Sequence, residues 1–452
     1  MGNNKRIVYD RLYLQMQFPS LISELLDCPG LLRLRDVRMA NNQFYAFPAF
    51  ANTSRYEHSL GVCYLAGITA DHLHLNEKDK LELMIAGLYH DVCTPPFAHA
   101  MEEVLQAKYG FNHEENLKQI ITGNTGEFDQ DFAQIYLGKA LKLKSIWQRK
   151  DARTIGIDLH RIAKIAVGSK DEILSSLING HFMDLDNIDN ICRAVSAMGI
   201  YDKNCDFADL AISLAKSFVK CDGKILYNAE HYDTIKKWVQ MRDFQYSKIY
   251  SSLDDFSYQA MIKRSIRYLC ENRVYSANFE KELWKKTDTE LTQILLENDK
   301  SRNLMERVLL CKPYHCLAIL YVRGKNVNHF LNCHIREMEK KVCYYLSKEI
   351  GIIRYANDNL VLANYYPDKR HRFIDCSEWS DICPETRIKS REEGSILGLF
   401  TSSKVSGFTL DKNHNNRTLR RFDKNNLPDL MNQIREILKD YEVIEYGKEN
   451  RD

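Results

Sequence analysis

The sequence lacks the features that mark several specialised classes of protein. Its 452 residues contain no apolar run near the roughly 20 residues of a membrane-spanning helix, so we expect no membrane partner. The first residues, MGNNKRIVYDRLY, lack the apolar segment of a secretion signal, and we expect a cytoplasmic protein. The 13 cysteines form no CxxC pair, which favours reduced thiols over a disulfide framework.

An excess of charge of one sign is also missing. The 63 Lys and Arg residues nearly balance the 61 Asp and Glu residues, and the formal net charge is +2. This balance gives no general reason to expect a nucleic-acid partner and leaves that question undecided. The chain has no internal repeat or low-complexity tract, and its length exceeds that of one hydrophobic core, so we expect two or three domains.

Apolar residues at helical spacing dominate residues 51–310 and predict a mainly α-helical core there. Leu81, Met84, Ile85 and Leu88 follow the i, i+3, i+4, i+7 pattern of a buried helix face. We expect the helices on either side of the polar connection near residue 75 to pack antiparallel. Residues 1–50 are expected to form a separate segment of short helices and turns.

The pattern changes after residue 310. Residues 315–324, 359–366 and 395–400 are apolar runs typical of strands, and a last strand is expected near residue 443. Helical periodicity returns at 330–348 and 427–441. This alternation predicts a smaller C-terminal α+β domain over residues 311–452.

Histidines and acids lie at the ends of the predicted core helices. His58 begins one apolar helical segment, and the pair His90–Asp91 ends another. Neighbouring residues on a helix point about 100° apart, but a His-Asp pair at a helix end can approach one ion from two sides. Three acids follow in DLDNID, residues 184–189, and their spacing alone does not separate them as ligands. Imidazole with carboxylate suits Mn, Fe or Zn better than Mg.

The runs RYEHSLGV, AGLYHD, PFAH and DLDNIDNICR, in this order, resemble the HD-domain metal phosphohydrolases. The resemblance is closer to their deoxynucleoside triphosphate triphosphohydrolase branch and covers roughly residues 5 to 275. It implies an all-helical HD core and a divalent metal ion (Mn, Fe, Zn or Mg) held by His58, His90, Asp91 and Asp186. The implied reaction is hydrolysis of deoxynucleoside triphosphates to deoxynucleoside and triphosphate.

The same resemblance implies roles for further residues. Arg55 would bind phosphate and assist catalysis, and His113 would be the general acid, with His99 as the alternative. The residues implied to bind substrate are Arg55, Arg242, Tyr246, Lys248, Tyr250 and Asn190.

A regulatory nucleotide site is implied near the N-terminus. Asp27 and Arg35 match residues that read an activating nucleotide between subunits in the family, with Arg6 as a helper, whereas Leu32 replaces a glutamine. Such a site implies a homo-oligomer, either a dimer or a tetramer. Composition alone instead predicts that the basic residues of 33–38 form a solvated face.

Departures from the family pattern keep other functions open. Thr94 replaces a histidine of the HDxGHxPFxH run, and Asn187 replaces a phosphate-binding lysine. Met39, Asn190 and Ala194 stand where the family has a glutamine, a tyrosine and an aspartate that hold the deoxyribose. The alternatives are an HD phosphohydrolase or phosphodiesterase acting on another nucleotide, and a non-catalytic nucleotide sensor.

Overall fold

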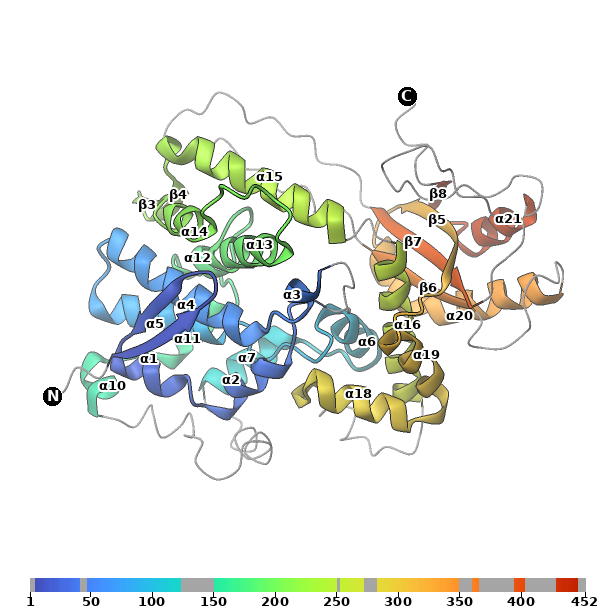
Figure 1. The fold of residues 1–452 in the computed structure, drawn as a ribbon, viewed down its shortest axis with the longest axis horizontal. Helices are drawn as coiled ribbons and strands as arrows, with labels where there is room; N and C mark the ends of the chain where they lie inside the picture. The colour runs from blue at the N-terminus through green and yellow to red at the C-terminus, as the bar shows by residue number, and fades with distance from the viewer. Residues whose placement is uncertain are drawn as a thin grey trace.

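The computed structural model describes residues 5–40, 47–122, 150–249, 253–271, 283–348, 360–365, 394–402 and 428–445 (Figure 1). Helices make up most of these residues, and a four-stranded sheet with its own helices lies beside them. The prediction of a mainly α fold with a smaller C-terminal α+β part is therefore confirmed. Within these ranges, no helix combines the length and the apolar character that a bilayer crossing requires.

An antiparallel hairpin opens the chain, where the sequence predicted only short helices and turns. Strand β1 (Arg6–Asp10) pairs with β2 (Leu14–Phe18) along its whole length. The Asp10 carboxylate accepts hydrogen bonds from the backbone N–H groups of Leu12 and Tyr13, at 2.9 and 3.0 Å, and so closes the turn. The short elements that follow are α1 (Ser20–Leu25), α2 (Pro29–Arg33), the 3-10 helix η1 (Leu34–Asp36) and α3 (Pro48–Ala51).

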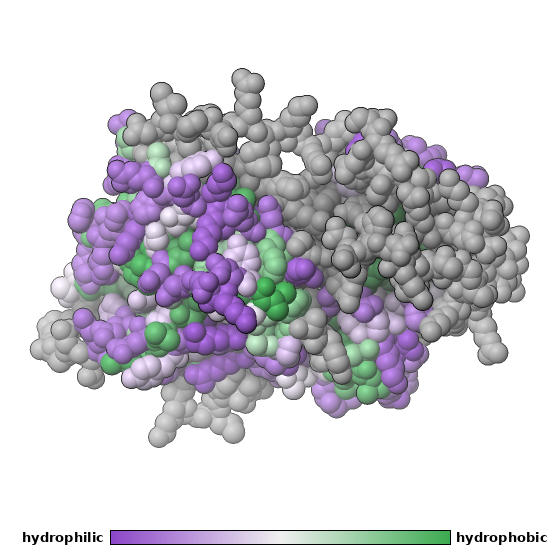
Figure 2. Space-filling view, turned by 45° about the horizontal axis from the view of Figure 1, so that its top comes forward, coloured by the Kyte–Doolittle hydropathy of each residue, from purple (hydrophilic) through white to green (hydrophobic). Residues whose placement is uncertain are grey.

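The hairpin was missed because only its second strand alternates in sequence. In β2, Leu14, Met16 and Phe18 alternate with glutamines, and Met16 and Phe18 are fully buried, whereas Ile7, Val8 and Tyr9 of β1 are consecutive apolar residues. One alternating run of five residues is too short a period-2 signal to identify a hairpin. Elsewhere, hydrophilic side chains cover most of the described helical surface visible in Figure 2.

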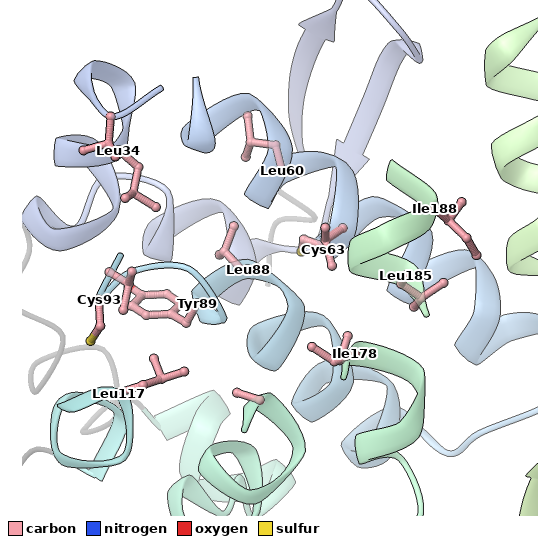
Figure 3. Packing of buried hydrophobic residues seen from close by; sticks show 14 of the residues in the cluster. Leu34, Leu60, Cys63, Leu88, Tyr89, Cys93, Leu117, Ile178, Leu185 and Ile188 are labelled. Atoms are coloured by element: carbon pink, nitrogen blue, oxygen red, sulfur yellow. The ribbon is translucent and has the colours of Figure 1, made fainter. Parts of the chain in front are cut away.

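Two helices that pack antiparallel, as predicted, form the centre of the fold. Gly87 lies against Val62 and Gly67 against Met84, so the residue order runs in opposite directions along the contact. The predicted apolar face of the second helix is buried, with Leu81 and Leu88 at 2% and 0% exposure. Figure 3 shows Leu88 and Tyr89 in this core beside Leu60 and Cys63. The two helices are α4 (Arg55–His72) and α5 (Glu77–Tyr89).

The remaining helical part surrounds this pair. Each large apolar side chain buried there contributes about 1.5–3 kcal/mol of transfer free energy. The elements are α6 (His99–Tyr109), α7 (His113–Thr122), α10 (Lys150–Ile155), α11 (Leu159–Ala166), α12 (Ser175–Ile178), α13 (Leu185–Met198), α14 (Phe207–Ala215), β3 (Phe218–Cys221), β4 (Lys224–Tyr227), η2 (Ala229–His231), α15 (Tyr232–Ile249), α16 (Leu253–Glu271), η3 (Leu283–Lys285), α18 (Asp288–Glu297) and α19 (Asp299–Leu309).

The C-terminal part is an antiparallel sheet with the strand order β6-β7-β5-β8. One face packs against α20 and α21, and the other lies against α16, where the rings of Phe256 and Phe400 meet edge to face at 5.3 Å (Figure 1). The sheet therefore shares part of the core of the helical region. Its elements are β5 (His315–Arg323), α20 (Val327–Lys348), β6 (Leu360–Tyr365), β7 (Gly394–Thr401), α21 (Pro428–Ile437) and β8 (Glu442–Glu445).

Candidate metal centre

Three helix ends bring two histidines and an aspartate together. His58 lies in the first turn of α4, behind a capping box formed by Ser54 and Glu57. His90 follows the last residue of α5, and Asp186 lies in the first turn of α13. The helix ends fix the backbone of each residue, so the side chains converge without a long flexible loop.

The three side chains form a group with the geometry of a metal site. One ligand atom from each residue lies within 4.8 Å of the others, and His58 Nε2 is 2.9 Å from Asp186 Oδ1. His90 Nε2 is buried, has no hydrogen-bond partner among the residues that the structure describes, and lies 3.7 Å from the same oxygen. His90 Nδ1 is 2.7 Å from the Gly87 carbonyl oxygen, which fixes the proton on Nδ1 and frees Nε2. An unsatisfied imidazole nitrogen that faces a carboxylate fits a bound divalent cation.

Asp91, the fourth predicted ligand, lies beside this group. Its Oδ2 is 3.9 Å from His58 Nε2 and 3.7 Å from His90 Nε2. The same oxygen is 2.5 Å from Arg55 Nη1, and Oδ1 accepts a hydrogen bond of 2.8 Å from the Thr94 hydroxyl. The Asp91 carboxylate thus lies beside both imidazole nitrogens while Arg55 and Thr94 hold it in place. Its role as a metal ligand stays a prediction.

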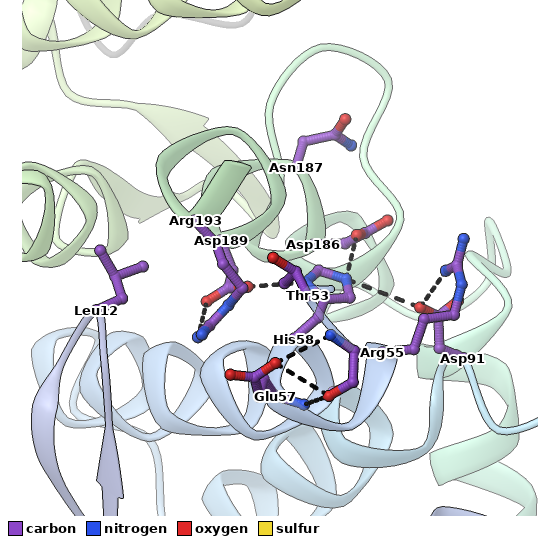
Figure 4. Close-up of polar contacts among 12 residues, drawn as sticks. Leu12, Thr53, Arg55, Glu57, His58, Asp91, Asp186, Asn187, Asp189 and Arg193 are labelled. Atoms are coloured by element: carbon purple, nitrogen blue, oxygen red, sulfur yellow. Dashed lines mark hydrogen bonds and ion pairs between the residues drawn. The ribbon is translucent and has the colours of Figure 1, made fainter. Parts of the chain in front are cut away.

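A buried network supports His58 from behind, and sequence reasoning did not find it. Asp189, one of the three acids of residues 184–189, is 2.8 Å from His58 Nδ1 through Oδ2 (Figure 4). Asp189 also accepts hydrogen bonds from the Tyr13 hydroxyl and from Arg193, and Arg193 reaches Asp10 at 2.8 Å. The turn of the N-terminal hairpin is therefore connected to a candidate metal ligand. The i, i+4 spacing of Asp189 and Arg193 was the available signal.

Asp184 and Asp186, the other two acids of residues 184–189, make different contacts. Asp184 is the N-cap of α13, where its side chain accepts hydrogen bonds from the backbone N–H and the side-chain amide of Asn187, both at 2.7 Å. Asp186 alone among the three faces His58 Nε2. This arrangement agrees with the choice of Asp186 that the family resemblance implied.

The charges in the centre shift the titration of its members. Burial lowers the pKa of His58, but hydrogen bonds to Asp186 and Asp189 outweigh this effect and raise it to about 9. Burial opposes ionisation of Asp186, but hydrogen bonds and charge from His58 and His90 hold its pKa well below the usual value. The carboxylates therefore favour positive charge at His58, and a metal cation would replace the proton that carries it.

The loop that carries Asp91 is held by a buried arginine. Arg33 is 0% exposed and donates hydrogen bonds to the carbonyl oxygens of Val92, Thr94 and Lys286, at 3.0, 2.7 and 2.8 Å. The prediction of a solvated basic face was wrong for this residue, because a buried guanidinium group can satisfy several backbone carbonyls at once, here two in this loop and one at Lys286.

The predicted acid His113 belongs to a second polar group near the centre. Its Nδ1 forms an ion pair with Glu102, which also lies 3.1 Å from His99 Nδ1 through its other oxygen. Burial lowers the pKa of His113, but the Glu102 carboxylate outweighs it and raises the pKa above the usual value. Sequence reasoning missed Glu102, although it lies three residues after His99 on the first turn of α6.

These groups line one cavity of about 370 Å³. It collects all the predicted catalytic and metal residues, two of the positions that depart from the family pattern (Met39 and Asn187), and two glutamines that the sequence did not single out. Its lining includes Arg55, His58, His90, Asp91, His99, His113, Asp186, Asn190 and Tyr246, and also Met39, Asn187, Gln245 and Gln259.

The other predicted substrate residues lie outside this lining or outside the described chain. Arg242 is 3% exposed, and its guanidinium carbon lies 4.6 Å from the centre of the Tyr246 ring. Lys248 is exposed and approaches the ring of Phe244 instead. Tyr250 lies outside the described residues.

The predicted regulatory residues are only partly in contact with one another. Arg6 Nη1 lies 2.8 Å from Asp27 Oδ1, and both side chains are partly exposed. The guanidinium carbon of Arg35 lies 4.8 Å from the centre of the Tyr56 ring. The role of these residues in binding a nucleotide stays a prediction.

Comparison with known proteins confirms the resemblance over the segment that carries His58, His90, Asp91 and His113. The family model of the HD domain matches residues 55–145. The protein named deoxynucleoside triphosphate triphosphohydrolase SAMHD1 homolog of Dictyostelium discoideum is 34% identical over 122 residues, which are 25% of this chain and 24% of the relative. The proteins named deoxynucleoside triphosphate triphosphohydrolase SAMHD1 of Bos taurus and Homo sapiens are 35% and 34% identical over 104 residues, or 22% of this chain. These residues are 18% and 16% of the two relatives, so each match spans less than a quarter of the relative.

Proposed function

Because the chain carries an HD domain, we propose that it is a metal-dependent phosphohydrolase that converts deoxynucleoside triphosphates to deoxynucleosides and inorganic triphosphate. The observation that carries this proposal is the convergence of His58, His90 and Asp186 in a cavity that Arg55 and His113 also line. The names of the relatives matched over this segment support the substrate class.

His58 Nε2, His90 Nε2 and Asp186 would hold the metal ion, with Asp91 at its side. A bound divalent cation supplies Lewis-acid activation of a phosphoryl oxygen and lowers the pKa of a bound water molecule. Mn, Fe and Zn suit this donor set, and Mg suits it less well. Asp189 and the Gly87 carbonyl keep the two imidazole rings in the tautomer that presents Nε2.

Arg55 neutralises phosphate charge in this proposal. Its Nη1 is bound to Asp91, but its buried Nε has no hydrogen-bond partner within the described ranges, and the residue lines the cavity. A planar guanidinium group fits phosphate oxygens, and phosphoryl transfer depends mainly on positioning and on charge neutralisation. Asp91 fixes the guanidinium, so little side-chain entropy is lost when substrate binds.

His113 delivers the proton to the leaving 5′-oxygen of the nucleoside. Glu102 pairs with its Nδ1 and raises the pKa of the ring, which favours the protonated form whose Nε2 proton can be transferred. Glu102 is thus a positioning residue that also tunes the acid. His99 shares the same carboxylate and is the second candidate for this role.

The part of the cavity that would meet the sugar differs from the pattern of the family. Ala194 is buried in a small apolar cluster with Ala40 and Phe50, and Met39 lines the cavity. Neither residue offers a polar contact to a 3′-hydroxyl group. Gln245 is 5% exposed, and its side-chain carbonyl oxygen has no hydrogen-bond partner in the described part of the chain, so selectivity would come from contacts of this amide or from shape.

One observation favours a nucleotide sensor as the second candidate. Thr94, at the place of a family histidine, donates its hydroxyl hydrogen bond to Asp91. A threonine hydroxyl does not titrate near neutral pH, so this substitution removes an ionisable group beside the centre. Binding without turnover would follow if that group is needed for the chemical step.

An activating nucleotide and a homo-oligomer, either a dimer or a tetramer, are part of the proposal. They rest on Asp27, Arg35 and Arg6 through the resemblance. The ion pair of Arg6 with Asp27 supports a shared position for two of these residues.

The test is incubation of protein loaded with Mn²⁺ with a pool of the four ribonucleoside and four deoxyribonucleoside triphosphates. Anion-exchange chromatography then separates the products. We expect deoxynucleoside and tripolyphosphate, and no products from His90→Ala protein. Release of monophosphate and pyrophosphate would indicate another reaction, and an unchanged pool with measurable nucleotide binding would identify a sensor.

A further inference from the structure

A second basic cluster lies away from the candidate metal centre, where α16 meets α20 of the C-terminal part. Arg264 and Arg267 lie three residues apart on α16, and Arg336 and Glu339 have the same spacing on α20. Residues at this spacing share one helix face. Arg264 is 0% exposed and Glu339 is 1% exposed, so the centre of the cluster is inside the protein.

The arginines of this cluster are not satisfied by the described part of the chain. All three guanidinium nitrogens of Arg264 are buried without a hydrogen-bond partner, as are Arg267 Nη1 and Arg336 Nε. The guanidinium carbon of Arg264 lies 3.8 Å from the centre of the Tyr268 ring. Such stacking uses the face of the group and leaves the N–H bonds in its plane without acceptors.

The one buried carboxylate in the cluster is already occupied. Glu339 Oε1 accepts the backbone N–H of Leu362 at 3.1 Å, and Oε2 accepts Arg336 Nη1 at 3.3 Å. Arg264 Nη1 approaches Oε2 at 3.4 Å as an ion pair without hydrogen-bond geometry. Three guanidinium groups against one buried carboxylate leave two positive charges.

The acids around the cluster do not remove this excess. Glu103 is 2.5 Å from Lys263, so that pair is neutral by itself. Glu271 is 3.8 Å from Arg336 Nε, but its side chain is 41% exposed and water screens its charge. Burial and the neighbouring charges of Arg264 and Arg336 outweigh Glu339 and Glu103 and lower the pKa of Arg267, which agrees with a surplus of positive charge.

We propose that Arg264, Arg267 and Arg336 bind a phosphate-bearing anion between α16 and α20. Burying a guanidinium group without an acceptor is costly, whereas a phosphoryl group offers up to three oxygens and about two negative charges. Planar guanidinium groups match such oxygens bidentately. Arg336 is 17% exposed and marks the side from which the anion enters.

The anion joins two parts of the fold. Gln259, five residues before Arg264 on α16, lines the candidate active-site cavity, and α20 packs under the C-terminal sheet. An occupied cluster would hold α16 against α20 and stiffen one wall of that cavity. The site is separate from the metal centre, so it stands or falls independently of the proposed reaction.

The test is binding to the full chain without metal, with EDTA present, at constant ionic strength. Isothermal titration with inorganic phosphate, tripolyphosphate and dATP distinguishes a free phosphate from a nucleotide, and sodium acetate serves as the control anion. We expect at least one phosphate compound to bind. We expect Arg264→Met to raise its Kd about tenfold to a hundredfold, because charge-assisted hydrogen bonds are lost.

A second measurement separates binding from a structural role. Arg264→Met removes an unsatisfied buried charge, so the Tm without ligand should stay equal or rise, whereas loss of a structural pair would lower it. Arg336→Gln, at a half-buried position, should weaken binding in the same direction. Arg323→Gln is the matched control, because Arg323 is an arginine at the surface of β5 with a 3.8 Å ion pair to Glu442.

Two outcomes would overturn the proposal. The first is no binding of any phosphate compound to the wild-type chain. The second is binding that Arg55→Met abolishes and Arg264→Met leaves unchanged, since this would place the anion in the candidate active site.

Discussion

Replacement of Asp189 by asparagine tests how the fold prepares His58 for a metal ion. The Asp189 carboxylate is 0% exposed. It lies 2.8 Å from His58 Nδ1 and from the Tyr13 hydroxyl, and accepts hydrogen bonds of 2.9 and 3.0 Å from Arg193. The variant keeps the size of the side chain but turns one acceptor oxygen into an NH₂ donor.

Either orientation of the new amide damages the centre. If its NH₂ group faces His58 Nδ1, the imidazole proton must move to Nε2, which then has no lone pair for a metal. If the NH₂ group faces Arg193 instead, two donors oppose each other in a buried site. Outer-shell partners of this kind are worth about 10–100-fold in metal affinity, or roughly 1.4–2.7 kcal/mol.

The assay is a calorimetric titration of the full chain with Mn²⁺, together with thermal unfolding. Asp10→Asn is the informative companion, because Asp10 is the other partner of Arg193 at 2.8 Å and does not touch His58. We expect both variants to lose stability, since each weakens a buried ion pair. We expect only Asp189→Asn to lose metal affinity tenfold or more.

Asp202→Asn, at an exposed loop position, controls for the change in net charge. Folded Asp189→Asn protein with the wild-type Mn²⁺ affinity would refute the reasoning. Equal losses of affinity in Asp189→Asn and Asp10→Asn would show that the network acts through general stability instead of the His58 tautomer.

Four further outcomes follow from the contacts in the site. His90→Ala should keep the helical circular dichroism spectrum but lose bound metal and turnover, and full metal stoichiometry by elemental analysis would contradict this. Glu102→Gln removes the carboxylate that raises the pKa of His113, so the alkaline limb of the kcat–pH profile should move to lower pH; an unmoved limb would assign the acid elsewhere. Asp27→Ala should abolish the activation and the assembly that added nucleotide causes, with assembly measured by mass photometry. A wild-type chain that shows one species with and without nucleotide would leave that site without a function. A substrate lacking the 3′-hydroxyl should keep kcat/KM within about tenfold, roughly 1.4 kcal/mol, and a larger loss would mean that other residues hold the sugar.

Periodicity predicted the parts of the fold in which one face of an element is buried. The apolar face of α5 and the strand and helix pattern after residue 310 are both found in the structure. Arg33 and the first hairpin were not predicted, for a shared reason. The interior position of a guanidinium group, or of a five-residue strand, depends on residues far away in the chain, such as the Lys286 carbonyl that Arg33 binds.

The residues of the candidate site likewise fall into those that the sequence indicated and those that only the structure revealed. Family motifs led to His58, His90 and Asp186, which the structure brings within one group. Glu102 and Asp189 were not assigned supporting roles, because their helical spacing to His99 and Arg193 is common on exposed helix faces and does not reveal which histidine a carboxylate contacts. Asp189 comes close to His58 only once α13 crosses α4, where a Cβ at Gly61 would lie 1.9 Å from Asp189 Oδ1.

That crossing also explains how the residues around the metal centre can match the family pattern while the residues proposed to meet the sugar depart from it. Asp186, Asp189 and Arg193 follow one stripe of α13, at i, i+3 and i+7, and serve the metal centre and its support. Asn190 and Ala194 lie one residue further round the helix, where Asn190 lines the cavity and Ala194 packs in a separate apolar cluster. Changes at these two positions leave every hydrogen bond of the His58 network in place. A new sugar contact is therefore compatible with an unchanged metal centre, and we expect Mn²⁺ affinity and sugar selectivity to respond to different variants of the same helix.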